Sequence, residues 1–220
     1  MIPAYPVYIF DVDGTLMDSA ADICGAIRQV IGARGRDGVS DDYLRRYIGR
    51  HLLDLFQDLD FPRESIDQMI AEYRELYLKR SHGATSVFPG IPEMLARLSG
   101  RKSTATTKGS VTTRAVLEQF GLIQHFEHVQ GTDGFPAKPQ PDVILRSIEK
   151  LGVKPEHCLL VGDAPADMEA GKRAGVHTCA VMWGYGSKDE IARWAPDYWI
   201  EEPADLIPLS RTVAKAPQRY

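Results

Sequence analysis

The sequence has few cysteines, no long apolar run and no excess of positive charge, and each absence excludes a class of protein. Its three cysteines are widely spaced in 220 residues, which predicts reduced thiols and excludes a CxxC metal or redox site. No apolar stretch approaches the ~18 residues of a membrane span. The 26 Lys and Arg against 30 Asp and Glu give a net charge of −4, without the basic excess expected of a protein that binds nucleic acid or an anionic membrane. The first residues also lack the basic and apolar regions of a secretory signal, so we expect a cytoplasmic protein.

The length suggests one domain with an insertion. At 220 residues the chain is longer than a typical domain of ~150 residues and short for two. The 44% of hydrophobic residues are sufficient for a sizeable core. The pattern along the chain predicts an α/β core from residues 1–17 and 87–209, a small all-helical insertion at 18–86, and a loose tail at 210–220.

The predicted core alternates strands and helices. Val7 to Phe10 and Cys158 to Val161 are continuous runs of β-forming apolar residues, as in strands buried on both faces of a parallel sheet. Weaker strands are expected at 101–106, 178–182 and 198–200, and helices at 92–98, 111–120, 141–151 and 167–174. We expect Ser110 to cap the second of these helices. This alternation predicts an α/β fold with a doubly wound parallel sheet.

The insertion has helical periodicity and almost no strand signal. Ile23, Ile27, Val30 and Ile31 share one face of an amphipathic helix. A helix carrying Leu44, Tyr47 and Ile48 is expected after Ser40, and a longer one at 62–80 with apolar and aromatic residues turned inward. The insertion is therefore predicted to be all-helical.

Acidic residues follow both strong strands. Asp11 and Asp13 come directly after the first strand, and Asp163 and Asp167 follow the strand at 158–161. Because ligands bind outside the carboxyl ends of parallel strands, we expect these four carboxylates to converge. Their mutual repulsion requires a cation, and oxygen ligands favour Mg²⁺.

Hydroxyl and ammonium groups are predicted at the same edge of the sheet. The segment Thr106, Thr107, Lys108 follows one strand, and Lys138 precedes a helix. Such groups beside a Mg²⁺ site are suited to a phosphate, and an Asp carboxylate can then act as a nucleophile.

Four separated motifs carry a resemblance to a known family. They are Asp11-Val12-Asp13-Gly14-Thr15-Leu16, Thr106 after a strand, Lys138-Pro139-Gln140-Pro141-Asp142, and Gly162-Asp163-Ala164-Pro165-Ala166-Asp167. In this order they resemble the haloacid dehalogenase-like superfamily, in its phosphoglycolate phosphatase-like branch with a helical cap. Two positions depart from the pattern: Ala164 stands where many relatives have Ser or Thr, and Thr107 where Asn is common.

The resemblance implies a role for each motif residue. Asp11 would be the nucleophile and a Mg²⁺ ligand, and Asp13 the general acid and then base, with its carbonyl on the metal. Thr106 and Lys138 would contact the phosphoryl group, and Gly14 would allow the backbone to approach it. Asp163 would bind Mg²⁺ directly, and Asp167 would bind it through water or orient Lys138.

Three more residues are candidate members of the site, and two of them have an alternative structural interpretation. Thr107 and Lys108 are candidates for phosphate contacts, although Lys108 equally suits a position near a helix start. Arg50 either grips a substrate carboxylate from the cap or is an exposed helix residue.

The expected activity is hydrolysis of a small phosphorylated metabolite, with phosphoglycolate the leading substrate. Asp13 argues against a dehalogenase, and the lack of a suitably placed cap lysine argues against a phosphonatase. A sugar phosphomutase remains the main alternative, and an inactive protein that binds a phosphorylated ligand is a third. The oligomeric state, monomer or homodimer, stays open.

Overall fold

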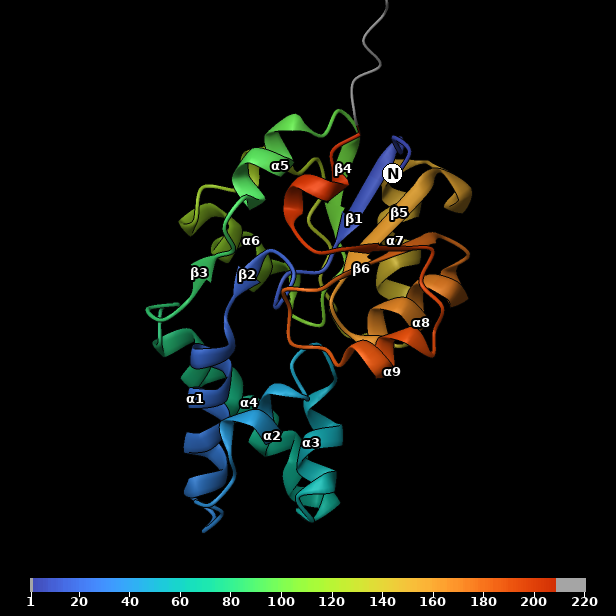
Figure 1. The fold of residues 1–220 in the computed structure, drawn as a ribbon. Helices are drawn as coiled ribbons and strands as arrows, with labels where there is room; N and C mark the ends of the chain where they lie inside the picture. Colours follow the sequence, from blue (N-terminus) through green and yellow to red (C-terminus); the bar gives the residue numbers. More distant parts are fainter. Residues whose placement is uncertain (1, 209–220) are drawn as a thin grey trace, which may run out of the picture.

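A five-stranded parallel sheet forms the centre of the computed structural model, which describes residues 2–208 (Figure 1). The strand order is β4-β1-β5-β6-β7, and every neighbouring pair is parallel. The strands are β1 (Val7–Phe10), β4 (Arg101–Thr104), β5 (Cys158–Gly162), β6 (His177–Val181) and β7 (Tyr198–Ile200). The predicted doubly wound α/β fold is confirmed: the chain passes from β1 to β4 on one side and then returns to add β5, β6 and β7 on the other side.

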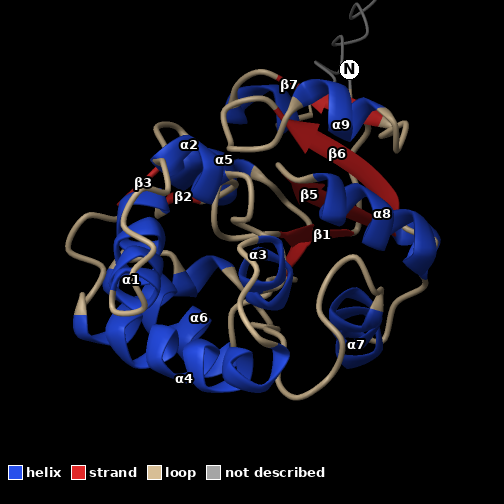
Figure 2. Ribbon diagram, turned by 90° about the horizontal axis from the view of Figure 1, so that it is seen from below, coloured by secondary structure: helices blue, strands red, loops and turns tan. Residues whose placement is uncertain are grey.

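Helices cover both faces of the sheet (Figure 2). Alternate residues of β1 face opposite sides: Tyr8 and Phe10 pack against α5 and α6, whereas Val7 and Ile9 pack against α7 and α8. All four side chains are buried, as expected of a strand inside a parallel sheet. The covering elements are α5 (Ile91–Arg97), α6 (Ser110–Gln119), α7 (Asp142–Leu151), α8 (Pro165–Ala174) and α9 (Lys188–Ala192), with 3₁₀ turns at Ile123–His125, Pro155–His157 and Pro203–Leu206.

The polar edge strand β4 ends at Thr104, two residues before the predicted end. The side chains of Lys102, Ser103 and Thr104 are buried, and each polar group has a partner within the protein. The ammonium of Lys102 donates to the carbonyls of Leu98 and Gly100, at 2.6 and 2.9 Å. A hydrogen bond to a buried backbone carbonyl offsets the loss of water from the ammonium. Polar side chains can therefore be buried in this edge strand.

Four helices between residues 20 and 79 form a separate cluster, which we call the helical module (Figure 1). They are α1 (Ala20–Gly32), α2 (Asp41–Arg45), α3 (Leu52–Asp58) and α4 (Arg63–Lys79). Their apolar faces bury a core of their own, with Ile27, Leu44 and Phe56 at its centre. The chain enters and leaves through a short antiparallel pair, β2 (Met17–Asp18) and β3 (Ser86–Val87). The two crossing points therefore lie side by side.

Several local predictions need correction. Ser110 is the first residue of α6 and not its cap, because its amide and hydroxyl bind the Asp133 carboxylate instead. The predicted helix after Ser40 ends at Arg45, before Tyr47 and Ile48, whereas α3 was not predicted as a separate helix. Ser40 does cap α2.

The remaining predictions concern the cysteines, the tail and the membrane. The three cysteines are buried and unpaired, as expected. The predicted tail lies outside the described residues. Within residues 2–208, we find no helix with the length and apolar character needed to cross a membrane.

Candidate active site

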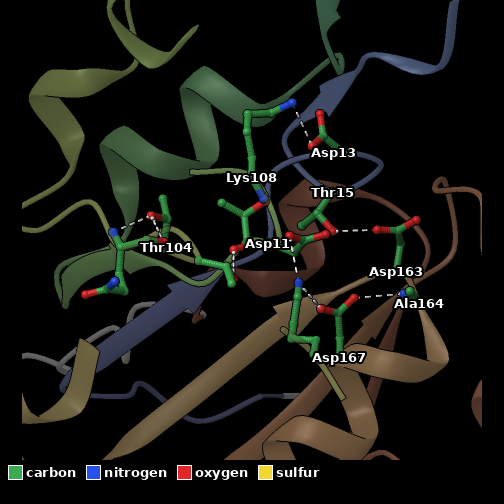
Figure 3. A network of polar contacts seen from close by, with 12 residues as sticks. Asp11, Asp13, Thr15, Thr104, Lys108, Asp163, Ala164 and Asp167 are labelled. Carbon is green, nitrogen blue, oxygen red and sulfur yellow. Dashed lines mark hydrogen bonds and ion pairs between the residues drawn. The ribbon is translucent and has the colours of Figure 1, made fainter. Parts of the chain in front are cut away.

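Two neighbouring strands, β1 and β5, bring the acidic motifs together (Figure 3). Asp11 follows β1, and its amide continues the ladder by donating to the Val161 carbonyl at 2.9 Å. Asp163 follows β5, and Asp167 lies in the first turn of α8. One carboxylate oxygen of each lies within 4.8 Å of the others, and all three residues are buried. The sequence prediction of carboxylates converging at this sheet edge is thus confirmed for three of its four members.

A single buried ammonium lies between two of these carboxylates. Lys138 Nζ is 2.8 Å from Asp11 Oδ1 and 2.5 Å from Asp167 Oδ1. Burial acts against the charged ammonium, but the two carboxylates outweigh it and raise the pKa of Lys138 above its ordinary value. The other oxygen of Asp167 accepts the Ala164 amide at 3.0 Å. Asp167 therefore fixes the position of Lys138, one of the two roles expected for it.

The three carboxylates together carry more negative charge than this ammonium balances. Burial, followed by the fields of Asp11 and Asp167, raises the pKa of Asp163 to about 8. Burial also raises the pKa of Asp11 to about 7, against the opposing effect of Lys138. Asp11 Oδ2 is buried without a hydrogen-bond partner. Three buried carboxylates within 4.8 Å of one another, with one ammonium to balance them, form an oxygen-rich environment that fits a divalent cation such as Mg²⁺.

Asp13 lies beside this cluster and is held by a different pair of groups. Its Oδ1 accepts the Ser19 hydroxyl at 2.6 Å, and its Oδ2 is 3.2 Å from Lys108 Nζ. The Lys108 ammonium also donates to the Tyr77 hydroxyl at 2.9 Å. The prediction that all four carboxylates meet is wrong in this respect: the Asp13 carboxylate turns toward Lys108 because an ammonium is available there (Figure 3).

The remaining motif residues surround the carboxylates. Thr106 is fully buried after β4, and its hydroxyl accepts the Lys108 amide at 3.3 Å. Thr107 follows it in a half-buried position. Gly14 adopts a positive φ of 89°, and a Cβ there would overlap the Asp163 carboxylate. Glycine is required at this turn both by its backbone conformation and by the close approach of Asp163.

Arg50 lies on the loop between α2 and α3, where the helical module meets the core. A Cβ on the preceding Gly49 would be 3.4 Å from Ala164 Cβ, so this loop lies close to the motif at the start of α8. The guanidinium is 3.8 Å from the Glu190 carboxylate, and its side chain is 37% exposed. Arg50 lines two clefts, one of about 460 Å³ and one of about 320 Å³ that also borders Lys138.

Sequence reasoning missed four residues that position the site. Thr15 and the Tyr185 amide hydrogen-bond Asp163 at 2.9 Å each, while Ser19 and Tyr77 act on Asp13 and Lys108. Thr15 belongs to the motif at 11–16, so its place in the sequence was a usable signal. Tyr77 and Tyr185 are far from any motif along the chain, and no local pattern distinguishes them from core aromatics.

The fold and site together define a class of enzyme. A doubly wound sheet presents a buried aspartate with a free oxygen, a lysine bound to it and further carboxylates at its carboxyl edge. The chain matches the family model described as haloacid dehalogenase-like hydrolase over residues 8–181, and it belongs to that family. It is an enzyme of the phosphoric monoester hydrolase class.

Known proteins resemble the chain over most of its length. A phosphoglycolate phosphatase from Aquifex aeolicus (strain VF5) is 34% identical over 210 residues, covering 92% of this chain and 95% of that protein. A 5′-nucleotidase from Pseudomonas aeruginosa is 31% identical over 207 residues, covering 92% and 94%. A solved structure of a haloacid dehalogenase-like family protein from Streptococcus pneumoniae has a TM-score of 0.86 at 25% identity, covering 92% of this chain and 96% of its own.

Proposed function

We propose that the protein is a magnesium-dependent phosphatase that hydrolyses a small phosphate monoester through a phosphorylated Asp11. The observation that carries this proposal is the state of the Asp11 carboxylate. Its Oδ1 is held by Lys138 at 2.8 Å, whereas its buried Oδ2 has no partner. A nucleophile requires such an oxygen, fixed in place and free of hydrogen bonds.

The reaction takes place in two halves. Asp11 Oδ2 attacks the phosphorus atom, the P–O bond to the leaving group breaks, and Asp13 donates a proton to the departing alkoxide. A water molecule then attacks the phosphorus atom, and Asp13, now a carboxylate, accepts a proton from this water. The bond to Asp11 then breaks, which releases phosphate and restores both aspartates.

Positive charge and hydroxyl groups around Asp11 stabilise the transferring phosphoryl group. Lys138 neutralises charge between Asp11 and the phosphoryl oxygens, and Thr106 and Thr107 lie after the neighbouring strand in positions suited to contact them. The Lys108 ammonium is instead held by Asp13 and Tyr77. Gly14 has no side chain, so the backbone can approach the phosphoryl group at this turn. These roles fit the burial and contacts of each residue.

Asp11 and Asp163 would hold the magnesium ion, together with the Asp13 carbonyl that the family resemblance implies. When bound, Mg²⁺ neutralises negative charge on the carboxylates and the phosphoryl oxygens. Both oxygens of Asp167 already have protein partners, Lys138 and the Ala164 amide. Asp167 would therefore bind the magnesium ion through a water molecule, or it would only orient Lys138.

We assign the segment 18–86 as a cap over this site and phosphoglycolate as the leading substrate. Arg50 supports both assignments, because it lines the cleft that borders Lys138 from the side of the helical module. A guanidinium can bind a carboxylate with two parallel hydrogen bonds. The relatives named phosphoglycolate phosphatase add to this support.

A panel of phosphorylated metabolites tests the activity, with phosphate release measured in Mg²⁺ and in EDTA. We expect phosphoglycolate to be among the best substrates and EDTA to abolish turnover. Asp11→Asn should lose at least about 10³-fold in kcat, because the nucleophile is removed. Asp67→Asn, an exposed aspartate on α4 outside the motifs, is the matched control and should retain wild-type activity. Full activity of Asp11→Asn would overturn the mechanism, and conversion of a hexose 1-phosphate to its 6-phosphate without phosphate release would favour a mutase.

Arg50→Ala tests the substrate. Loss of a carboxylate contact should raise KM for phosphoglycolate about tenfold or more, while KM for an uncharged alkyl phosphate changes little. An unchanged KM for phosphoglycolate would remove the main structural support for this substrate.

A further inference from the structure

Tyr77 connects the helical module to the proposed acid–base residue. We propose that Tyr77 is a positioning residue that holds Asp13 in place through Lys108; this rests on the proposed function, in which Asp13 transfers the protons. Tyr77 belongs to α4, more than sixty residues from Asp13 along the chain.

A short chain of contacts carries the proposal. The Lys108 ammonium donates to the Tyr77 hydroxyl at 2.9 Å and lies 4.1 Å from the centre of the Tyr77 ring. The same ammonium is 3.2 Å from Asp13 Oδ2. The side chains of Lys108 and Asp13 are each only 9% exposed, so water competes little for these contacts.

Lys108 needs a second partner to stay in this position. A lysine ammonium is a point charge at the end of a flexible four-carbon stem, with three donors that can turn toward any acceptor. The Tyr77 hydroxyl takes one donor, and its ring face attracts the cation. With these two contacts the ammonium is confined to the side of Asp13 that faces α4.

Tyr77 is itself rigid enough for this task. Its side chain is 4% exposed, and its ring stacks on Tyr73 at 5.8 Å and meets the edge of His82 at 5.1 Å. A ring packed between two others has a single rotamer, so its hydroxyl has a defined position.

The arrangement fixes both oxygens of Asp13. Ser19 donates to Oδ1 from the start of the helical module, and Lys108 holds Oδ2. Release of Lys108 leaves only Ser19 and allows the carboxylate to rotate. Proton transfer needs heavy atoms within about 3 Å, so a rotated Asp13 slows the chemical steps while substrate binding is unaffected.

Tyr77→Phe removes the hydroxyl and keeps the ring. We expect kcat for an alkyl phosphate to fall about tenfold with KM within a factor of two, because misplacement of a proton-transfer group affects chemistry and not binding. Tyr73→Phe is the matched control on the same helix: the Tyr73 hydroxyl makes no hydrogen bond within residues 2–208, so this variant should retain wild-type kcat. Equal kcat for Tyr77→Phe and wild type would overturn the proposal.

A double-mutant cycle identifies the path. If Tyr77 acts through Lys108, adding Tyr77→Phe to the Lys108→Met variant should not lower kcat further, so the two effects on kcat are not additive. If the fold reductions in kcat of the two single variants multiply in the double variant, Tyr77 acts by another route and the proposal is contradicted.

A crystal structure of Tyr77→Phe gives a readout that does not depend on activity. We expect an intact helical module in which the Lys108 ammonium has left Asp13 Oδ2. An unchanged Lys108–Asp13 contact would overturn the inference, even if the wild-type protein proved to have no phosphatase activity. Absence of wild-type turnover together with a displaced Lys108 would instead contradict the proposed function and leave the positioning contact established.

Discussion

Replacing Asp163 with asparagine removes one charge from the buried carboxylate cluster and preserves its shape. The carboxylate accepts the Thr15 hydroxyl and the Tyr185 amide, at 2.9 Å each. Asparagine can meet the same partners, because its oxygen accepts the amide and its NH₂ donates to a rotated hydroxyl. The substitution therefore tests the electrostatics of the site with little steric change.

The magnitude follows from the pKa of Asp163, which burial and the neighbouring carboxylates raise to about 8. In the unfolded chain this carboxyl titrates near its ordinary value of about 4. Between these two values the unfolded state releases its proton and the folded state keeps it, so the metal-free protein loses stability as pH rises from 4 to 8. Four pKa units correspond to about 5 kcal/mol. This value already includes the hydrogen bonds from Thr15 and the Tyr185 amide, which act to lower the pKa. Asparagine is neutral at every pH, so above pH 8 we expect Asp163→Asn to be about 5 kcal/mol more stable than wild type in EDTA.

Urea denaturation at pH 8.5 and pH 5, in EDTA and in excess Mg²⁺, measures this difference. At pH 5 only about one pKa unit of the shift contributes, so the stability advantage of the variant should fall to about 1 kcal/mol. Mg²⁺ at one hundred times its dissociation constant should stabilise wild type by about 2.7 kcal/mol and the variant by much less. A variant less stable than wild type in EDTA at pH 8.5 would refute the reasoning, as would equal stabilisation of both proteins by Mg²⁺.

The remaining predictions concern the site geometry and the junction between module and core. Gly162→Ala would place a methyl group inside the Asp167 side chain, so we expect a folded protein with at least about tenfold lower kcat, and wild-type kcat would contradict this. Asp22 is buried and accepts hydrogen bonds from Arg80, the Ala84 amide and Thr85. Burial acts to raise the pKa of Asp22, but these bonds outweigh it and lower the pKa. Asp22→Asn should therefore destabilise the protein by about 2 kcal/mol in urea above pH 4, and the difference from wild type should shrink as pH falls below 4; a constant difference would show that charge is not the cause.

The position of the site followed from local patterns. Val7 to Phe10 and Cys158 to Val161 are apolar runs that end in aspartates, and parallel strands bring their carboxyl ends to one edge. The meeting of Asp11 with Asp163 was therefore predictable without coordinates. Lys138 was expected at the same edge of the sheet, but its burial between Asp11 and Asp167 is visible only in the structure.

Other features depended on partners that the sequence does not place. The strand β4 gave a weak signal because Lys102 is polar, and only the carbonyls of Leu98 and Gly100 make its burial acceptable. The Asp13 carboxylate was expected among the other three, but Lys108 turns it away. Ionic and hydrogen-bonded pairs between distant segments have no periodicity, so pattern analysis cannot find them.

The sequence by itself determined the alternation of strands and helices in the core and the acidic loops after β1 and β5, because burial patterns and turn residues act over a few neighbouring positions. Only the tertiary structure decided how these groups are paired. It left Asp11 Oδ2 free, bound Asp167 to Lys138, and brought Tyr77 from the helical module against Lys108. The physical reason is range: a hydrogen bond is made within about 3 Å, and the folded chain alone brings residues so far apart in sequence to that distance.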